Sequence, residues 1–318
     1  MSAPDAGAVR ELTGADLLVL RALGLGDLLA GVPALRGLRR AFPDRRLLLA
    51  APAGIGGFLQ RRGVVDEVLV TAGLEPLRAK GSGHLAVDLH GNGPASRDPL
   101  AATGPDGLLG FRTDGHDGPE WVRDEHEVAR WCRLVAAWGA ACGPEDLRLR
   151  PRGPVPADGP VVVHPGAAFA SRRWPVQRWA AVVGGLTAAG HEVHVTGTAD
   201  EADLGAALAG AGAVDRCGDL DLDGLAGLVG SARLVLSGDT GTAHVATALG
   251  VPSVLLFGPT PPHWWGPAID EDRHVVLWHG DPAATGYVGD PHGAQVDPTL
   301  ARITVEEVLA ASAAFLVG

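Results

Sequence analysis

The stretch that decides the fold of this chain runs from Ala232 to Pro261 and reads ARLVLSGDTGTAHVATALGVPSVLLFGPTP. Its apolar run at 234–236 predicts a strand, and the segment 242–249, closed by a glycine and a proline, predicts a helix. A second apolar run at 254–257 follows at once, which is the spacing of a βαβ unit. The turn between strand and helix should therefore lie at the carboxyl edge of a parallel sheet, where open α/β folds bind ligands.

The turn itself, Gly238-Asp-Thr-Gly-Thr242, carries groups suited to both halves of a nucleotide sugar. Backbone N–H groups at a helix N-terminus attract phosphate, whereas the carboxylate of Asp239 and the hydroxyls of Thr240 and Thr242 can hold a sugar or a ribose. The same Asp and Thr side chains are also common helix caps. This segment alone leaves both interpretations open.

Length and composition favour a two-domain globular protein. The chain has 318 residues, 46% of them hydrophobic, which exceeds the size at which a single core usually keeps growing. No apolar run is long enough to span a membrane, the N-terminus lacks a signal-peptide pattern, and the three cysteines show no CxxC spacing. We therefore expect a cytoplasmic protein without a transmembrane segment and with at most a peripheral membrane contact.

The charge pattern bears on the class of ligand. A formal net charge of −11 repels polyanions, so nucleic-acid binding is not expected, although a small anion can bind where arginines gather. HExxH does not occur and the twelve histidines are scattered, so no metal site is predicted. The sequence thus favours a small-molecule ligand.

Short apolar runs alternate with helical patterns in the first half of the chain, which implies a parallel sheet with helices on both faces. The predicted strands are 17–20, 47–50, 68–70 and 85–89. A turn at 21–27 should lead into one helix reaching about Phe42, and 120–141 returns to helical spacing. Residues 1–14 are expected to form a loose leader, and the Gly-, Pro- and Asp-rich segment 91–118 a mobile loop.

The pattern restarts after a proline-rich linker at 151–160, so the second half repeats the architecture of the first. It predicts strands at 161–163 and 192–196, helices at 175–189 and 201–209, and a terminal helix at 304–317 that Thr304 and Glu307 cap. We predict a first domain at 1–152, a second at 160–302 and a C-terminal helix at 303–318. Two such sheets, facing each other across an interdomain cleft, would form a small-molecule site.

The first predicted βα turn, Gly24-Leu-Gly-Asp27-Leu-Leu29, lacks the third glycine of a dinucleotide fingerprint, which would fall at Leu29. Asp27 would also place a carboxylate where a pyrophosphate binds, so an NAD site is not expected. Asp27 has two interpretations that the residues leave open. It is either the N-cap of the following helix or a carboxylate positioned to take a proton from a hydroxyl.

A loop from His164 to Pro175, HPGAAFASRRWP, follows the first strand of the second domain and delivers Arg172 and Arg173 to a helix start. This arrangement suits a diphosphate and can stabilise a nucleotide leaving group, although exposed arginines on a helix lead-in are the common alternative. His164 by itself reads as a packed residue. Glu201 can accept a hydrogen bond from a ribose or serve as a helix-start acid. The tandem Trp264-Trp265 can pack on a base or sugar, or between domains.

Together these segments resemble glycosyltransferase family 9, the bacterial heptosyltransferases of lipopolysaccharide core assembly. The four motifs that carry the resemblance are RALGLGDLLAGVPALR at 21–36, HPGA from 164 with RRWP ending at 175, GDTGTAHVATALG from 238, and LFGPTP from 256. The resemblance implies a GT-B fold of two Rossmann-like domains, with the acceptor held by the first domain and a nucleotide-sugar donor by the second. It also implies metal-independent, inverting transfer without a cofactor, and a terminal helix that packs back on the first domain.

The resemblance implies roles for individual residues. Asp27 matches the catalytic base, and Arg172 falls where the family commonly has a Lys against the donor diphosphate. The residues that we accordingly predict to bind the donor are His164, Gly166, Arg172, Arg173, Glu201, Asp239, Thr240, Gly241, Thr242 and His244. Segment 91–118 has no excess of basic residues, so a lipopolysaccharide acceptor is not part of the prediction.

The predicted function is transfer of a heptose-like sugar from a nucleoside-diphosphate sugar to a hydroxyl of a glycan, glycolipid or small-molecule acceptor, with Asp27 as general base. Two alternatives share the fold: a nucleotide-sugar 2-epimerase, which acts on the donor alone, and a non-catalytic nucleotide-binding scaffold.

Overall fold

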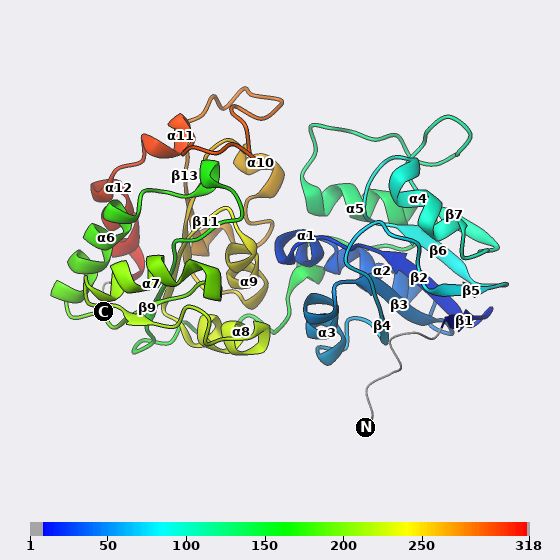
Figure 1. Ribbon diagram of the computed structural model, residues 1–318, viewed down its shortest axis with the longest axis horizontal. Coiled ribbons are helices and arrows are strands. Elements are labelled where there is room, and N and C mark those ends of the chain that lie inside the picture. The colour runs from blue at the N-terminus through cyan, green and yellow to red at the C-terminus, as the bar shows by residue number, and fades with distance from the viewer. Residues whose placement is uncertain (1–8, 317–318) are drawn as a thin grey trace. The chain divides into compact units, whose positions relative to one another are not determined.

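The computed structural model describes residues 9–316. The chain divides into two compact units (Figure 1), of which the first contains the residues up to Val122 together with Glu127–Asp146. The second contains Arg123–His126 and the residues from Leu147 onward. The proline-rich segment 151–160 is a loop of the second unit.

The first unit is built on a five-stranded parallel sheet with the order β4-β3-β2-β6-β7. These strands are β2 (Asp16–Leu20), β3 (Arg46–Ala51), β4 (Glu67–Val70), β6 (Leu85–Asp88) and β7 (Gly107–Leu109). The central strand β2 is buried along its whole length, as its apolar run predicts. Its last residue, Leu20, pairs with Ala50 on one side and Asp88 on the other, so the residues after β2 and β6 meet at one edge.

The α-helices described in this unit are α1 (Leu25–Ala30), α2 (Val32–Ala41), α3 (Ala53–Arg61), α4 (Pro94–Ala101) and α5 (Glu127–Ala136), and they lie along the sheet (Figure 1). The single helix predicted up to Phe42 is therefore wrong, because the chain is interrupted at Gly31 between α1 and α2. Pro33 stands in the first turn of α2, where its missing N–H is tolerated. A Cβ at Gly31 would lie 2.8 Å from Cδ of Arg21, so this position requires a glycine.

Two other predictions for the first unit need correction. Segment 91–118 contains α4 and β7 instead of forming one loop. Part of the predicted leader 1–14 is β1 (Arg10–Leu12), which pairs in parallel with β5 (Ala79–Gly81), while residues 1–8 lie outside the described residues. Both segments are short or rich in Gly and Pro, so they lack the periodicity that marks longer elements.

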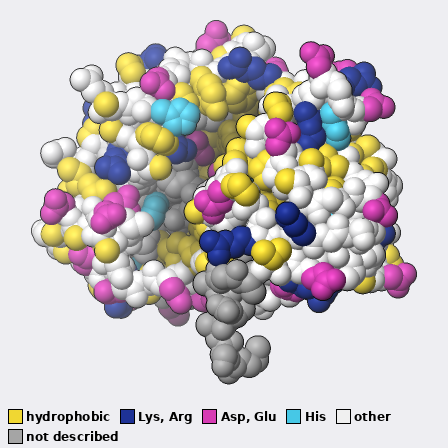
Figure 2. Space-filling view, turned by 45° about the vertical axis from the view of Figure 1, so that its right-hand side comes forward, with side chains coloured by type: hydrophobic (Ala, Val, Ile, Leu, Met, Phe, Trp, Pro, Cys, Tyr) yellow, Lys and Arg dark blue, Asp and Glu magenta, His cyan; other side chains and the backbone are white. Residues whose placement is uncertain are grey.

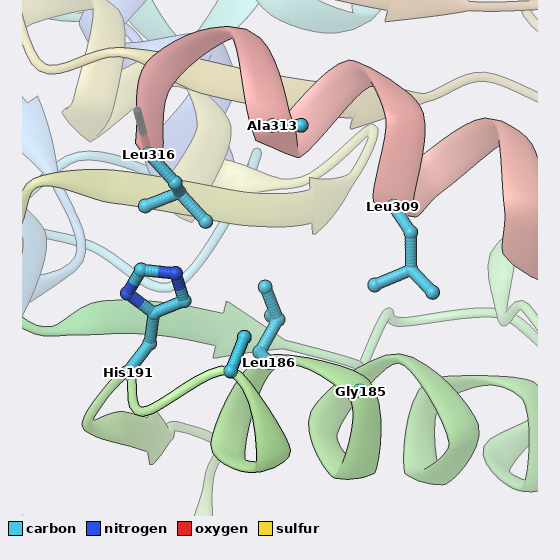
Figure 3. Close-up of a pocket in the computed structure, with 7 residues that line it drawn as sticks. Gly185, Leu186, His191, Leu309, Ala313 and Leu316 are labelled. Atoms are coloured by element: carbon cyan, nitrogen blue, oxygen red, sulfur yellow. The ribbon is translucent and has the colours of Figure 1, made fainter. Parts of the chain in front are cut away.

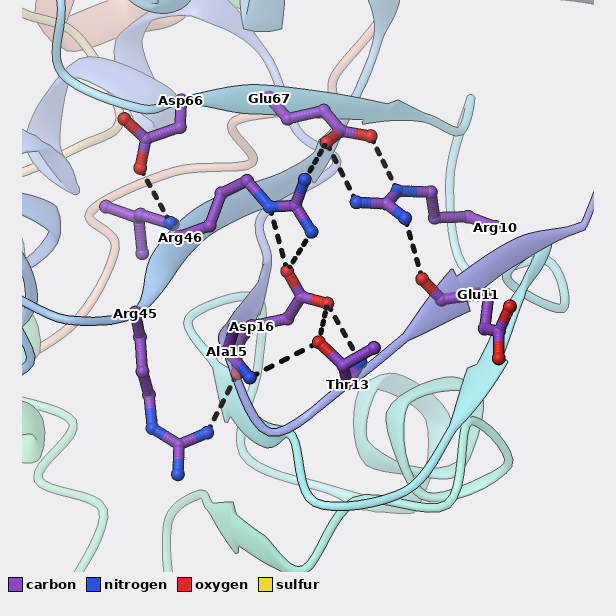
Figure 4. A network of polar contacts seen from close by, with 10 residues as sticks. Arg10, Glu11, Thr13, Ala15, Asp16, Arg45, Arg46, Asp66 and Glu67 are labelled. Atoms are coloured by element: carbon purple, nitrogen blue, oxygen red, sulfur yellow. Dashed lines mark hydrogen bonds and ion pairs between the residues drawn. The ribbon is translucent and has the colours of Figure 1, made fainter.

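A polar network joins the strands at the amino edge of the first unit (Figure 4). Asp16 accepts hydrogen bonds from the Thr13 backbone at 2.9 Å and from Nε and Nη2 of Arg46 at 2.9 and 2.7 Å. Glu67 accepts two more from Arg10, at 2.8 and 3.1 Å. The buried carboxylate of Asp16 is thus fully bonded, and the network ties β1, β2, β3 and β4 together.

The second unit contains a six-stranded parallel sheet with the order β10-β9-β8-β11-β12-β13. The strands are β8 (Val161–His164), β9 (Val193–Val195), β10 (Val214–Asp215), β11 (Leu234–Gly238), β12 (Ser253–Leu256) and β13 (His274–Leu277). The predicted βαβ unit is confirmed as β11, α9 (Gly241–Leu249) and β12. Ser237 pairs with His164, so the loops after β8 and β11 leave the sheet side by side.

Further helices surround this sheet: α6 (Val176–Ala188), α7 (Ala202–Ala209), α8 (Leu222–Ser231), α10 (Pro262–Trp265), α11 (Pro298–Ala301) and α12 (Val305–Leu316). Single turns of 3-10 helix are η1 (Pro144–Leu147), η2 (Ala170–Arg172), η3 (Ala199–Glu201) and η4 (Glu271–Arg273). The predicted capping of α12 is confirmed, because Thr304 N donates to Glu307 at 2.7 Å and Glu307 N donates to Thr304 at 3.2 Å.

The terminal helix α12 packs against α6 and the strands of the second unit. An apolar cavity of about 250 Å³ lies between the two helices. Figure 3 shows Leu309 and Leu316 of α12 across the cavity from Leu186 of α6, with His191 at one end. None of the residues lining this cavity is among those predicted to bind substrate.

The surface carries charges of both signs. On the face shown in Figure 2, Lys and Arg side chains are interspersed with Asp and Glu side chains. Among residues 9–316, no helix combines the length and apolar character needed to cross a bilayer.

Candidate functional site

The turn after β11 opens helix α9 and carries Asp239 and Thr240. Thr240, rather than Asp239 or Thr242, occupies the N-cap position of α9, and its side chain makes no capping hydrogen bond. Its Oγ1 lies 2.9 Å from Oγ of Ser237 instead. Gly241 is the first residue of the helix, so the first amides of this N-terminus follow Asp239 closely in the chain.

Arg172 reaches the same turn from the loop after β8. Its Nη1 lies 3.9 Å from Oδ2 of Asp239, and their side chains are 26% and 10% exposed. The close approach depends on Gly238, since a Cβ there would lie 3.3 Å from the Arg172 carbonyl oxygen. Nε of Arg172 is buried and makes no hydrogen bond within residues 9–316. The structure therefore brings together the predicted diphosphate arginine and the predicted sugar-side carboxylate.

His164, at the end of β8, is half-buried and contacts Oγ1 of Thr196 through Nδ1 at 3.1 Å. Burial lowers the pKa of His164, and the nearby charge of Glu201 only partly opposes this effect. The ring is accordingly neutral near pH 7. This agrees with its interpretation as a packed residue, and it places a neutral imidazole at the edge where Arg172 also emerges.

Glu201 makes a capping box with Thr198, whose backbone N–H and hydroxyl donate to Oε2 at 2.8 and 3.2 Å. It is therefore a helix-start acid, one of its two interpretations. The other carboxylate oxygen faces Gly166, where a Cβ would lie only 2.0 Å from Oε1. Gly166 thus lets the HPGA loop lie against Glu201, so two predicted donor residues are in contact.

The other predicted donor residues surround these groups. Arg173 is exposed and donates from Nε to the Ala167 carbonyl at 2.7 Å, which closes its own loop. Thr242 is buried, and the half-buried ring of His244 lies 5.9 Å from the Trp265 ring. All of them belong to the second unit, at the carboxyl ends of β8, β9 and β11.

The tandem tryptophans have different environments. Trp264 is 4% exposed, and its indole N–H donates to Oδ1 of Asp124 at 2.8 Å. Trp265 packs with Ala243 and Phe257 beneath α9. Both side chains therefore pack within the second unit.

Asp27 lies in the first turn of α1, two residues inside the helix, and Gly24 is the N-cap. The interpretation of Asp27 as the N-cap is therefore wrong. Its half-buried carboxylate folds back over the turn, since a Cβ at Gly24 would lie 3.4 Å from Oδ2. A carboxylate in the first turn interacts favourably with the helix dipole.

Arg21 fixes the backbone of Asp27, and sequence reasoning gave this arginine no role. Its side chain is fully buried, with Nε donating to the Asp27 carbonyl at 2.5 Å and Nη1 to the Leu89 carbonyl. Nη2 donates to Glu127 at 3.1 Å, and the guanidinium lies 4.6 Å from the Trp131 ring centre. An arginine directly after a buried apolar strand was the available signal, because such a charge requires partners.

Two further groups at this edge were not singled out by sequence. Asp88 ends β6 and is 2% exposed, and burial raises its pKa. His90 follows two residues later and accepts a hydrogen bond from Ala22 N at 3.1 Å. Within residues 9–316, no three His, Cys, Asp or Glu side chains gather closely enough to hold a metal ion.

Comparison with known proteins identifies the family. Residues 144–286 match glycosyltransferase family 9 (heptosyltransferase). This match covers less than half of the chain. The resemblance inferred from the four motifs is thereby confirmed.

The chain is similar to lipopolysaccharide heptosyltransferase 2 of Escherichia coli K12, with 30% identity over 157 residues. That match covers 45% of this chain and 44% of the relative, so it spans less than half of the relative's length.

Solved structures of the family match over almost the whole chain. The family 9 glycosyl transferase of Veillonella parvula DSM 2008 has a TM-score of 0.76 at 18% identity, covering 97% of this chain and 99% of that one. The E. coli ADP-heptose lps heptosyltransferase II has a TM-score of 0.70 at 21% identity, covering 95% and 98%. The predicted GT-B fold with Rossmann-like units is therefore confirmed.

Proposed function

We propose that this family 9 protein is a glycosyltransferase that moves a sugar from a nucleoside-diphosphate sugar to an acceptor hydroxyl. The observation that carries the proposal is the pairing of Arg172 with Asp239 at 3.9 Å, beside the N-terminus of α9. A guanidinium and free helix amides bind phosphate oxygens, while a carboxylate accepts hydrogen bonds from sugar hydroxyls. The relatives named above are heptosyltransferases, which supports a heptose-like sugar and ADP as its nucleotide.

We assign donor binding to the predicted second domain, residues 160–302. In this assignment Arg172 and Arg173 hold the diphosphate, Asp239 faces the transferred sugar and Glu201 accepts from the ribose. The two oxygens of Glu201 already have different surroundings, because Oε2 is bonded to Thr198 and Oε1 faces Gly166. The remaining donor contacts are assigned to His164, Gly166, Thr240, Gly241, Thr242 and His244.

We assign acceptor binding to the first domain, residues 1–152, with Asp27 as the general base. Asp27 takes the proton of the acceptor hydroxyl, whose oxygen attacks the anomeric carbon of the donor sugar. The bond from that carbon to the phosphate oxygen breaks with inversion, and the electron pair leaves with the nucleoside diphosphate. Arg172 stabilises the charge that develops on the leaving group, so the proposed mechanism needs no metal ion.

The first experiment is binding of ADP and ADP-heptose, measured by calorimetry, followed by an assay of ADP release from ADP-heptose. The acceptors are free heptose and a lipid-free lipopolysaccharide core oligosaccharide. Transfer that requires acceptor and Asp27 is the expected result. Conversion of the donor to an epimer without acceptor would instead identify a 2-epimerase. Tight donor binding with neither transfer nor hydrolysis would identify a scaffold.

A further inference from the structure

We propose that His90 binds the acceptor beside Asp27, as a neutral imidazole that is fixed in one tautomer and donates from Nε2–H. This inference rests on the proposed function and extends it, because it assigns an acceptor contact and an acceptor class. It is argued entirely within the first unit, where His90, Arg21 and Asp27 all lie.

The backbone of His90 is held by Asp88 at the end of β6. Oδ1 of Asp88 accepts from the N–H groups of His90 and Gly91, at 2.9 and 3.3 Å. Oδ2 accepts from the Ser96 hydroxyl at 2.6 Å. Three hydrogen bonds to one buried carboxylate make this turn rigid, so the imidazole starts from a fixed position.

The imidazole tautomer follows from a single hydrogen bond. The backbone N–H of Ala22 donates to Nδ1 of His90 at 3.1 Å, so Nδ1 carries no proton. A neutral ring must then carry its proton on Nε2. Nε2 makes no hydrogen bond within residues 9–316, while the side chain is half-buried. The ring therefore presents one unused donor of fixed direction.

Burial and a neighbouring positive charge keep the His90 ring neutral. Burial and the positive charge of Arg21 lower the pKa of His90 to about 4. The other charged groups of this edge are Asp88, which bonds the His90 backbone, Glu127, which pairs with Arg21 and Arg130, and Asp27 in the first turn of α1. A neutral donor does not form an ion pair with the Asp27 carboxylate.

One side chain links the turns that carry His90 and Asp27. The Arg21 guanidinium bonds both the Asp27 carbonyl and the carbonyl of Leu89, the residue before His90. The adjacent parallel strands β2 and β6 deliver both turns to the same edge. In the proposed arrangement, Asp27 and His90 contact different atoms of one small ligand.

The chemistry of the two groups defines the acceptor class. A donor aimed at the attacking oxygen would oppose its nucleophilicity, so His90 must bond a second oxygen of the acceptor. The acceptor is therefore a sugar or polyol with an oxygen next to the hydroxyl that Asp27 deprotonates. Loss of one such hydrogen bond costs about 1.4 kcal/mol, or roughly tenfold in affinity.

The first test is nitrogen-15 NMR of the histidine rings in the full chain, with His90 assigned by comparison with His90→Gln. We expect the Nε2–H tautomer and a ring that stays neutral from pH 8 to 5. In Arg21→Met the pKa of His90 should rise, because a positive charge is lost. In Arg21→Lys the pKa of His90 should stay low. His84, whose pKa burial also lowers in this unit, reports whether each variant remains folded. An Nδ1–H tautomer, or titration near 6.5 in the folded wild type, would overturn the proposal.

The second test is transfer from ADP-heptose to the lipid-free core oligosaccharide. His90→Ala should raise the acceptor KM about tenfold with ADP affinity unchanged, and His90→Gln, which keeps an N–H donor, should recover most of that loss. His84→Gln is the matched control, because His84 precedes β6 at the opposite edge and bonds Thr103. An unchanged acceptor KM in His90→Ala refutes the His90 assignment alone. Absence of ADP and ADP-heptose binding by the wild type, or full transfer by Asp27→Asn, refutes the proposed function itself.

Discussion

Nη1 of Arg172 lies 3.9 Å from Oδ2 of Asp239, although the two residues follow different strands, β8 and β11. This separation is at the outer limit of an ion pair and longer than a bidentate guanidinium–carboxylate contact. Nε of the same guanidinium is buried without a hydrogen bond among the described residues. Arg172 therefore retains donors for an anionic ligand.

Substitution of Arg172 should weaken nucleotide binding. Arg172→Ala removes a charged donor, so we expect ADP affinity to fall by about 10- to 100-fold. Arg172→Lys should have an ADP affinity between those of the wild type and Arg172→Ala, because a point charge replaces the planar guanidinium. Calorimetry with ADP measures the effect. Arg152→Ala is the control, since Arg152 pairs with Asp272 before β13, at the opposite edge of the sheet. Equal affinities for all four proteins would remove Arg172 from the diphosphate site.

Asp27→Asn should separate catalysis from binding. The amide cannot take a proton, so kcat for transfer should fall by ~10² to 10⁴, while ADP affinity stays within about twofold of the wild type. Stopped or continuous assay of ADP release gives kcat, and calorimetry gives the affinity. A variant with near-normal kcat would show that another group serves as base.

Gly166→Ala should disturb the donor site through Glu201. A Cβ at Gly166 would lie 2.0 Å from Oε1 of Glu201, so the carboxylate must move and its bonds to Thr198 must weaken. We expect a loss of about 1–3 kcal/mol in the free energy of unfolding and a weaker affinity for ADP. Gly184→Ala is the control, because Gly184 has open space at its Cβ position in helix α6. If ADP affinity survives while stability falls, Glu201 has only its capping role.

Acidification should destabilise the second unit through His274. Burial lowers the pKa of His274 from 6.5 to about 4. Below pH 6.5 His274 binds a proton in the unfolded chain but not in the folded protein. The contribution of neutral, buried His274 to the free energy of unfolding is therefore complete above pH 6.5 and is lost as the pH falls toward 4. Urea unfolding between pH 7.5 and 4.5 should show the decline, and His274→Gln should have a flatter profile. Identical pH profiles for the two proteins would contradict this account.

Asp16 should contribute to stability without affecting the substrate site. Burial alone would raise its pKa, but the hydrogen bonds from Thr13 and Arg46 lower it below 3.8 overall. This stabilisation is present above pH 3.8 and is lost as the pH falls through the lower, folded-state pKa. Asp16→Asn should cost about 2–4 kcal/mol in the free energy of unfolding at pH 7 and leave ADP affinity unchanged. A change in ADP affinity would show that the Asp16 network is coupled to the proposed ADP site.

Sequence patterns predicted those parts of the molecule in which burial is continuous. Strands β2, β8 and β11 are buried over nearly their whole length, so apolar runs located them and the glycine after α9 located its end. Because parallel strands deliver their following loops to one edge, the motifs at Arg172 and Asp239 were predicted to share a site. The distance between them depends on β8 lying next to β11, which chain order does not reveal.

The remaining features depend on contacts that no local pattern encodes. Residue 31 must be a glycine because the Arg21 side chain occupies the space of a Cβ, and Arg21 in turn pairs with Glu127, far along the chain. Helix α4 was missed because it contains Pro99 within a Gly- and Pro-rich segment. The tautomer of His90 follows from one backbone amide, that of Ala22, whose proximity is a product of the fold.

The contact between Arg21 and Gly31 makes the residue types that are tolerated at these two positions depend on each other. A Cβ at Gly31 would lie 2.8 and 3.0 Å from Cδ and Nε of Arg21, so an arginine at the first position requires a glycine at the second. In a library that randomises both codons, selection for a folded protein should retain them as a pair. Any replacement of the glycine should survive only together with a smaller side chain at position 21.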